Sequence, residues 1–334
     1  MEKKPHITRK SLLWQIPLLV LLVVGTFFIA RQHRAETQAA RQQEYRHNEG
    51  FIFGTVYNLT YQADADLHES VVRALGKIDA EFSMFNEKST ISAINRGESP
   101  KRSEMFEEVY KLAMDVNADT EGAFDVTVAP LVNAWGFGFK NEKLPTPEQV
   151  DSLLAIRSQM DFSAIAKGYG CDVAARVLRE QGVKNFMVEI GGEVVTSGVN
   201  PQGEAWHIGV SRPEEGKMPD TSDLQAVVAV SDAALATSGN YRNFYYRGGR
   251  KYAHTIDPRT GYPVQHELLS ATVFAPSCAM ADAYATAFMV MGLEPAKKLL
   301  EKHPEMKAYL IYTDKDSSLR EWVSPGLNVE APNK

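Results

Sequence analysis

The segment from Met280 to Gly292 constrains the fold most strongly. It reads M-A-D-A-Y-A-T-A-F-M-V-M-G, is rich in helix formers and is apolar on nearly all sides, which predicts a buried helix. Asp282 and Thr286 interrupt this pattern four residues apart, so they share one face. A buried carboxylate is costly unless it is paired or bound to a cation, and two oxygen donors suit Mg2+ better than zinc. Alternatively, Asp282 caps the helix and Thr286 bonds back to a carbonyl of the preceding turn.

The rest of the chain predicts an α+β fold with mixed sheets and flanking helices, because strand patterns occur in groups with helices between and after them. Strands are predicted over Phe51–Tyr61, Lys184–Gly192, Trp206–Ser211, Gln225–Val230, Asn243–Tyr246 and Ser270–Ala275. Helices are predicted over Asp66–Phe82 and Glu104–Asn117, and within Asp161–Gln181 the stretch D-F-S-A-I-A-K-G-Y-G is expected to lead into a helix that continues through Arg179. Thr237–Tyr241 is predicted to be a loop of small residues.

The N-terminal region predicts a membrane anchor. Residues 11–30 contain no charged residue and are just long enough to span a bilayer. Basic residues within 1–10 favour a cytoplasmic N-terminus and an exported remainder, which implies a single-pass protein of the inner (cytoplasmic) membrane with its folded part on the periplasmic or extracytoplasmic side. A cleaved signal peptide is the alternative. The polar residues 31–50 indicate a stalk, and the folded domain is expected over residues 51–330.

Charge and cysteine content narrow the function further. The net charge of −6 provides no basic surface for nucleic acid, so we expect none to bind. The spacing of the two cysteines, Cys171 and Cys278, fits no zinc or thioredoxin-like motif, and the sequence leaves their pairing open.

Two glycine pairs stand beside charged residues. Lys167 precedes Gly168-Tyr169-Gly170 where a helix is expected to begin, an arrangement that suits a phosphate group. The alternative is a tight turn beside a solvated lysine. Asp161 and Ser163 stand just before this helix, where capping would explain one of them. Gly191-Gly192, flanked by Glu189 and Glu193, could form a turn between strands or approach a ligand closely.

His254 begins the motif H-T-I-D-P-R-T-G, in which Asp257-Pro258 and Gly261 mark a turn. A histidine at the mouth of a turn can act as a general base, although a structural role is the alternative. Three features of this chain together indicate phosphoryl chemistry: the pair of candidate metal ligands Asp282 and Thr286, a helix entrance that suits a phosphate, and a candidate base.

Six motifs in a fixed order resemble those of the ApbE-type FAD:protein FMN transferases. They are G-A-F-D-V-T-V-A-P-L-V-N-A-W-G-F-G, D-F-S-A-I-A-K-G-Y-G, E-I-G-G-E, T-S-G-N-Y, H-T-I-D-P-R-T-G and A-D-A-Y-A-T. The resemblance runs from about Phe51 to about Gly326 and implies an α+β fold of the ApbE type. It also implies a Mg2+-dependent transfer of the FMN half of FAD to a threonine hydroxyl of an acceptor protein, with release of AMP.

The resemblance implies roles for individual residues. Mg2+ would be held by the side chains of Asp282 and Thr286 and the backbone carbonyl of Ala164. His254 would activate the acceptor hydroxyl, with Asp257 as its supporting partner or as an alternative base. The residues expected to contact FAD are Phe85, Val126, Thr127, Val128, Asp161, Lys167, Glu189, Gly191, Gly192 and Ile256.

The resemblance also implies partners and leaves two rival functions. The acceptor would carry a flavinylation-type Ser/Thr motif in a subunit of a Na+-pumping or Rnf-type redox complex. One rival is a Mg2+-dependent FAD pyrophosphatase, in which water replaces the acceptor hydroxyl. The other is a non-catalytic, membrane-tethered FAD-binding protein. Many relatives carry a lipid-anchor cysteine near the N-terminus, which this chain does not have, so its apolar segment would replace the lipid.

Overall fold

The computed structural model describes residues 44–137, 144–156, 159–213, 223–241, 244–247 and 249–332, together with a few single positions between 22 and 31. Within those residues no helix is both long enough and apolar enough to cross a bilayer. Most of the predicted anchor at 11–30, the N-terminal residues 1–10 and most of the predicted stalk lie outside the described residues.

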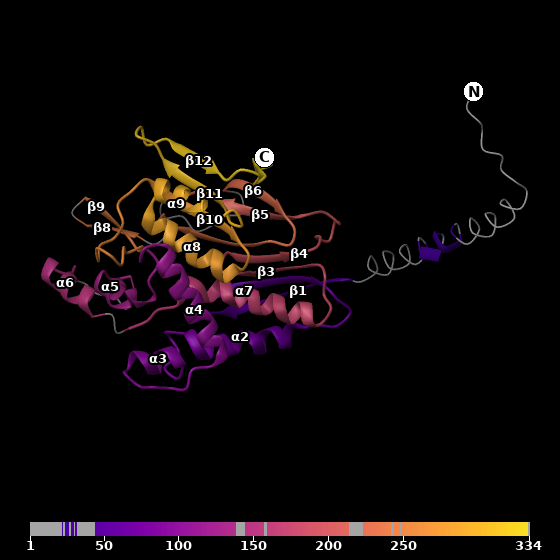
Figure 1. Cartoon of the computed structure of the whole chain (residues 1–334), viewed down its shortest axis with the longest axis horizontal. Coiled ribbons are helices and arrows are strands. Elements are labelled where there is room, and N and C mark those ends of the chain that lie inside the picture. Colours follow the sequence, from indigo (N-terminus) through magenta and orange to yellow (C-terminus); the bar gives the residue numbers. More distant parts are fainter. Residues whose placement is uncertain are drawn as a thin grey trace, which may run out of the picture.

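An eight-stranded antiparallel sheet forms the centre of the fold (Figure 1). Its strand order is β1-β2-β3-β4-β7-β10-β11-β12, while β13-β6-β5 and β8-β9 form two smaller sheets. The strands are β1 (Tyr45–Ile52), β2 (Thr55–Gln62), β3 (Phe186–Ile190), β4 (Glu193–Ser197), β5 (Trp206–Ser211), β6 (Leu224–Val230), β7 (Ala234–Gly239), β8 (Phe244–Arg247), β9 (Arg250–Ala253), β10 (Leu268–Ala275), β11 (Lys307–Thr313), β12 (Leu319–Val323) and β13 (Val329–Glu330).

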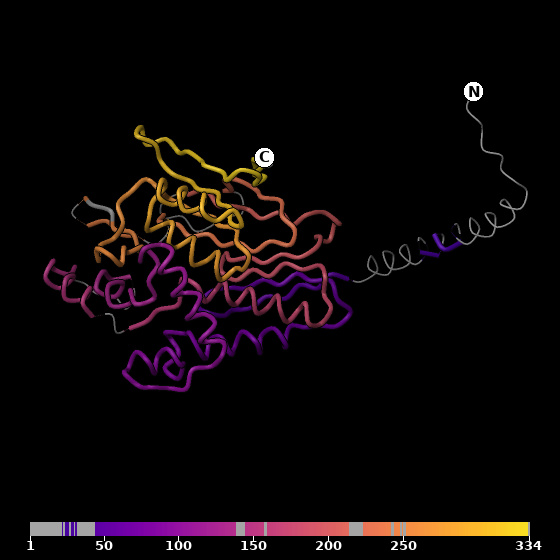
Figure 2. Tube along the Cα trace, viewed as in Figure 1, coloured from indigo at the N-terminus to yellow at the C-terminus, as the bar shows by residue number. Residues whose placement is uncertain are grey.

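The helices of the described residues are α2 (His68–Phe82), α3 (Thr90–Asn95), α4 (Glu104–Asp119), the 3₁₀ helix η1 (Val126–Val128), α5 (Ala129–Ala134), α6 (Pro147–Ala155), α7 (Ser163–Glu180), α8 (Cys278–Met291) and α9 (Leu293–Leu300). The long helices α7 and α8 cover one face of the large sheet, while α5 and α6 pack against each other at one end of the molecule (Figure 1). Helix α7 packs on β3 and β4, and α8 packs on β7 and β10. Helices α2 and α4 lie against this inner pair, and the trace in Figure 2 shows how these segments, distant in sequence, come together.

The opposite face of the sheet is partly covered by the three-stranded sheet. Val194, Leu235, Phe274 and Tyr309 of the large sheet pack there against Val228 of β6. The result is a layer of helices, a central sheet and a partial second sheet, which confirms the α+β prediction.

Most predicted elements agree with the structure, and the first disagreements lie in the β1–β2 region and at the end of β7. Residues 45–50 belong to β1 rather than to a stalk, and the predicted strand over Phe51–Tyr61 is interrupted by a turn at Phe53-Gly54, both with positive φ. The sequence of β1 is rich in polar residues because β1 is an edge strand of the sheet and exposes one of its sides to solvent. Thr237–Gly239 ends strand β7 instead of forming a loop. Its small residues suit this position, since the Thr237 hydroxyl lies 2.9 Å from that of Thr272 on β10.

Close packing between α7 and α8 explains the Gly168-Tyr169-Gly170 motif. Helix α7 begins at Ser163, so both glycines lie inside the helix, and the prediction of a phosphate-binding helix entrance at this motif is wrong. A Cβ on Gly168 would lie 2.3 Å from the carbonyl oxygen of Cys278, and one on Gly170 would lie 2.7 Å from Cε2 of Phe53. The motif therefore lets the two helices and the β1–β2 turn approach one another.

Both cysteines are free thiols in this interface. The Cys171 thiol donates to the carbonyl of Glu193, and the Cys278 thiol donates to the carbonyl of Leu235. Burial raises the pKa of both thiols. They stabilise the contact between helix and sheet as small buried side chains rather than as a disulfide.

The packing of α7 on α8 predicts opposite effects for two glycine substitutions. Gly168→Ala should lower the free energy of unfolding by roughly 1–3 kcal/mol, because its methyl group would overlap backbone atoms. Gly76→Ala in α2 is the matched control, since a Cβ at Gly76 meets no atom within 4 Å. That control should raise stability by about 0.5–1 kcal/mol, the usual gain from alanine in a helix. Chemical denaturation of both variants measures the difference, and equal stabilities would contradict this packing argument.

Candidate functional site

A cavity of about 930 Å³ opens where the β1–β2 turn, the β3–β4 turn, the start of α7 and the middle of α8 meet. Its volume lies in the upper part of the range of roughly 300–1,000 Å³ that is usual for small-molecule sites. The cavity gathers all but two of the predicted site residues. Those that line it are Phe85, Val126, Val128, Asp161, Ala164, Lys167, Glu189, Gly191, Gly192, His254, Ile256, Asp282 and Thr286.

The centre of the cavity holds one ammonium group between two buried carboxylates. Nζ of Lys167 lies 2.7 Å from Oε1 of Glu193 and 3.7 Å from Oδ1 of Asp282. Glu193 and Asp282 are each 2% exposed. Burial raises the pKa of both carboxyl groups, while the Lys167 ammonium opposes that change. Burial alone would lower the pKa of Lys167, but the charges of Asp282 and Glu193 raise it on balance, so the lysine remains cationic.

Asp282 is in the interior of α8 and does not cap it. The helix N-cap is Ser277, whose hydroxyl accepts from the amide of Met280. The Asp282 carboxylate reaches across to α7, where Oδ2 accepts a hydrogen bond of 3.0 Å from the amide of Gly168. The capping alternative for Asp282 is therefore wrong.

Thr286 presents its hydroxyl toward the sheet rather than toward its own helix. Its Oγ1 lies 3.2 Å from the hydroxyl oxygen of Ser238 on β7. Because Thr286 follows Asp282 by one helical turn, its hydroxyl and the carboxylate lie on the same wall of the cavity.

The oxygen atoms near Asp282 fit a hard cation. Within α7 the carbonyl of Ala164 faces the amide of Gly168, four residues later. Oδ2 of Asp282 accepts from the same amide, so the two oxygen atoms converge on one N–H group. Carboxylate, hydroxyl and carbonyl oxygens are the donors that Mg2+ takes in proteins. The described part of the chain has no cluster of three His, Cys, Asp or Glu side chains arranged as metal ligands.

The Gly191-Gly192 pair forms a two-residue turn between β3 and β4. Both glycines have positive φ, 63° and 103°, which places the turn in the conformation that joins twisted antiparallel strands. The amide of Gly192 donates to Oε1 of Glu189 at 2.8 Å, and the Glu189 carboxylate also accepts from the side chain of Asn58. The prediction that Gly191-Gly192 forms a turn between strands is confirmed. The same turn places Glu193 at the start of β4.

The start of α7 is fixed by Asp161, whose Oδ1 accepts from the amide of Ser163 at 2.8 Å. The N-cap position of α7 is Phe162, which makes no side-chain cap hydrogen bond, so neither Asp161 nor Ser163 is the N-cap; Asp161 precedes the cap and also lines the cavity.

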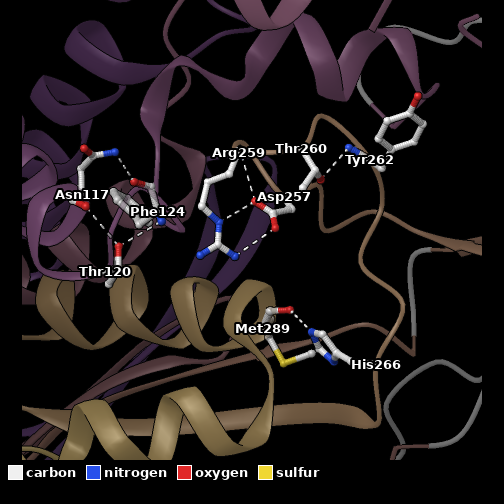
Figure 3. Close-up of polar contacts among 9 residues, drawn as sticks. All are labelled: Asn117, Thr120, Phe124, Asp257, Arg259, Thr260, Tyr262, His266 and Met289. Atoms are coloured by element: carbon white, nitrogen blue, oxygen red, sulfur yellow. Dashed lines mark hydrogen bonds and ion pairs between the residues drawn. The ribbon is translucent and has the colours of Figure 1, made fainter. Parts of the chain in front are cut away.

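Thr127 does not line the cavity, although its neighbours Val126 and Val128 do. Its hydroxyl and its amide both donate to Oδ1 of Asp125, at 2.7 and 2.8 Å. Asp125 caps η1 in this way and itself faces the cavity. Upstream, Asn117 and Thr120 hold the backbone of Phe124 by hydrogen bonds (Figure 3), which fixes the segment that carries Asp125.

Asp257 is not among the residues that line the cavity, although its neighbours Ile256 and Pro258 are. Its carboxylate forms a bidentate pair with Arg259, with both N–O distances 2.9 Å (Figure 3). The predicted role of Asp257 as a support of His254 or as an alternative base stays a prediction, since its carboxylate is bound to Arg259 in this structure. His254 lies edge-on to Phe137, which also lines the cavity.

Sequence reasoning missed several polar residues that line the cavity, among them Glu193, Ser238 and Asp125. Glu193 closes the E-I-G-G-E motif, Ser238 lies within T-S-G-N-Y, and Asp125 lies within G-A-F-D-V-T-V. Their presence in these motifs was the available signal. Asp125 binds its near neighbour Thr127, whereas the partners of Glu193 and Ser238 lie on distant segments and follow only from the tertiary structure.

Known proteins share this sequence and this architecture. The sequence model of the ApbE family matches residues 53–310. The FAD:protein FMN transferase of Vibrio cholerae is 35% identical over 300 residues, which covers 81% of this chain and 89% of that protein. The protein of the same name from Escherichia coli is 30% identical over 339 residues, covering 92% of this chain and 95% of that protein.

Solved structures agree with the sequence comparisons. The flavin transferase ApbE from Vibrio cholerae superimposes with a TM-score of 0.76 at 35% identity, covering 85% of this chain and 98% of that one. The apo form of the Pseudomonas stutzeri flavinyl transferase ApbE gives a TM-score of 0.74 at 29% identity, covering 85% and 95%. From the match over residues 53–310 and these similarities, we conclude that this chain belongs to the ApbE family.

Proposed function

We propose that this chain transfers the FMN moiety of FAD to a threonine or serine hydroxyl of an acceptor protein, with Mg2+ as cofactor and AMP as the second product. The observation that carries the proposal is a single cavity in which Lys167, the Asp282–Thr286 pair and His254 face the same space. Family membership supports it, since relatives carry the name FAD:protein FMN transferase.

The lining of the cavity offers surfaces that suit a flavin nucleotide. Phe85 is 83% exposed at the rim, where its ring can stack on the flavin. Val126, Val128 and Ile256 provide apolar surface beside it. The backbone of Gly191-Gly192 carries no side chain and allows a close approach of the ligand.

Asp282, Thr286 and the carbonyl of Ala164 would hold Mg2+. When bound, the ion stabilises negative charge on the pyrophosphate. Lys167 contributes a second positive charge within the same buried space, where electrostatic interactions are stronger than in water.

The residues of the chain can then be assigned to the reaction. The acceptor oxygen forms a bond to the FMN-side phosphorus, and the bond from that phosphorus to the oxygen of AMP breaks. His254 takes the proton of the attacking hydroxyl. Water in place of the hydroxyl would give FMN and AMP, the pyrophosphatase reaction, whereas a carrier protein would release neither.

The first prediction concerns the overall reaction. We expect a reaction when the chain from residue 44 onward is mixed with FAD, Mg2+ and an acceptor domain that carries a flavinylation-type motif. The acceptor should gain the mass of FMN and AMP should be released, and EDTA should abolish both. Asp282→Ala should lower the rate by at least about 100-fold, the order seen when a group that stabilises transition-state charge is removed. Intact-mass spectrometry measures the product. AMP without a mass gain would favour the pyrophosphatase, and a fully active Asp282→Ala variant would contradict the metal assignment.

A second prediction compares two residues of one motif. His254→Ala should slow transfer by about 10²–10⁴-fold while FAD binding persists, since general bases contribute that much. Asp257→Asn should change the rate little and cost at most about 1 kcal/mol of stability, because its pair with Arg259 is partly exposed. Single-turnover rates and thermal unfolding separate the two effects. Equal losses of rate would indicate that Asp257 acts in the reaction after all.

We also propose that residues 11–30 attach the protein to the inner membrane, with the folded domain outside the cytoplasm, and that the acceptor belongs to a Na+-pumping or Rnf-type redox complex. The apolar, uncharged composition of that segment supports the attachment.

This attachment yields a third prediction. The full chain should sediment with membranes and resist extraction by high salt, whereas a chain that begins at residue 44 should remain soluble. Protease added to spheroplasts should digest the folded domain of the full chain. If expression of the full chain instead gave a soluble product with a shortened N-terminus, the segment would be a cleaved signal peptide.

A further inference from the structure

Glu193 has no role in the reaction proposed above, yet it is one of the most deeply buried charged residues of the described chain. Its Oε1 contacts the ammonium of Lys167 at 2.7 Å, and its buried Oε2 has no hydrogen-bond partner among the described residues. Burying a carboxylate is costly unless its partner compensates. The ion pair with Lys167 is therefore the interaction that compensates the burial of Glu193.

The same ammonium also forms a longer ion pair with Asp282. The distance of 3.7 Å from Nζ to Oδ1 of Asp282 exceeds a hydrogen bond, while the 2.7 Å contact with Glu193 is a short one. The other oxygen of Asp282, Oδ2, is already held by the amide of Gly168. Oδ1 is thus the oxygen left for a cation, and Lys167 is the group that would otherwise occupy it.

Backbone structure fixes Glu193 in this position. It is the first residue of β4, and its partner across the strands is Ile190 at the end of β3. The two-glycine turn between them is short, and the carbonyl of Glu193 accepts from the Cys171 thiol of α7. Glu193 and Lys167 are therefore held to each other by both the sheet and the helix.

We infer that Glu193 is a positioning residue that holds the Lys167 ammonium off Asp282 and so keeps Oδ1 of Asp282 open to a divalent cation. The inference rests on the proposed function for the identity of the cation site. Without the Glu193 charge, the ammonium of Lys167 moves from its present 3.7 Å to hydrogen-bond distance of Oδ1 of Asp282. A cation must then displace that ammonium before it can bind.

Metal binding by the FAD-free protein tests this directly. Mn2+ serves as the probe and is titrated by electron paramagnetic resonance. Glu193→Gln should weaken Mn2+ binding about 10- to 100-fold, the range found when groups that orient metal ligands are changed. Lys167→Met should bind Mn2+ at least as tightly as the wild type. The double variant should bind like Lys167→Met alone, because no ammonium remains to compete.

A matched control removes an equal charge from the same cavity. Glu189→Gln changes a carboxylate that contacts Asn58 and Gly192 rather than Lys167, so its Mn2+ affinity should stay within a few-fold of wild type. Circular dichroism of each variant checks that it folds, and if Glu193→Gln does not fold, Glu193→Asp is titrated instead. Its shorter side chain should weaken Mn2+ binding in the same direction, with the same rescue by Lys167→Met.

Each outcome bears on the inference. Unchanged binding in a folded Glu193 variant would overturn it, and so would a double variant as weak as Glu193→Gln, since Glu193 would then act on the ion itself. A wild-type protein that binds no Mn2+ would contradict both this inference and the metal assignment. Normal Mn2+ binding without flavin transfer would contradict only the proposed reaction.

Discussion

The contact between α7 and α8 is the constraint on which the site depends. Gly168 lets the helices approach until its amide donates to the Asp282 carboxylate, and this bond partly compensates the burial of that charge. Lys167, one residue earlier on α7, consequently faces the same carboxylate. A larger residue at position 168 would separate the helices, so the geometry of the charged groups follows from helix packing rather than from a flexible loop.

The electrostatics of the cavity follow from this geometry. When both carboxyl groups are ionised, two carboxylates against one ammonium leave an excess of negative charge in a space where charges interact strongly. Because burial raises the pKa of both carboxyl groups, a cation would favour their ionised state, and a cation beside Lys167 would make the same space favourable for phosphate groups. In the proposed reaction the two requirements would therefore be linked, because the residues that would hold the metal also determine whether the pyrophosphate is attracted.

Local sequence patterns predicted the features that depend on neighbours along the chain. The i, i+4 spacing placed Asp282 and Thr286 on one face, and alternation or helical spacing identified the long helices α2, α4, α7 and α8 and the strands β2, β3, β5, β6, β8 and β10, but not the remaining strands and short helices. Patterns failed where distant segments decide the structure. Gly168 and Gly170 suggested a loop because glycine usually marks one, whereas here they accommodate Cys278 and Phe53. Ser238 and Glu193 acquire their partners, Thr286 and Lys167, only after the sheet and helices assemble.

Within the motif from His254 to Gly261, neighbouring residues have different structural roles. His254 faces the cavity, but Asp257 binds Arg259, and the carbonyl of Gly261 accepts from the indole of Trp135 at 2.7 Å. A Cβ on Gly261, at φ 80°, would lie 2.5 Å from Val150.

The second half of the motif therefore attaches this loop to α5 and α6, and the first half presents the candidate base. Replacement of His254 would reduce activity without loosening the small apolar cluster around Trp135, whereas replacement of Gly261 would loosen that cluster. Measurements of stability alongside rate are what distinguish the two halves.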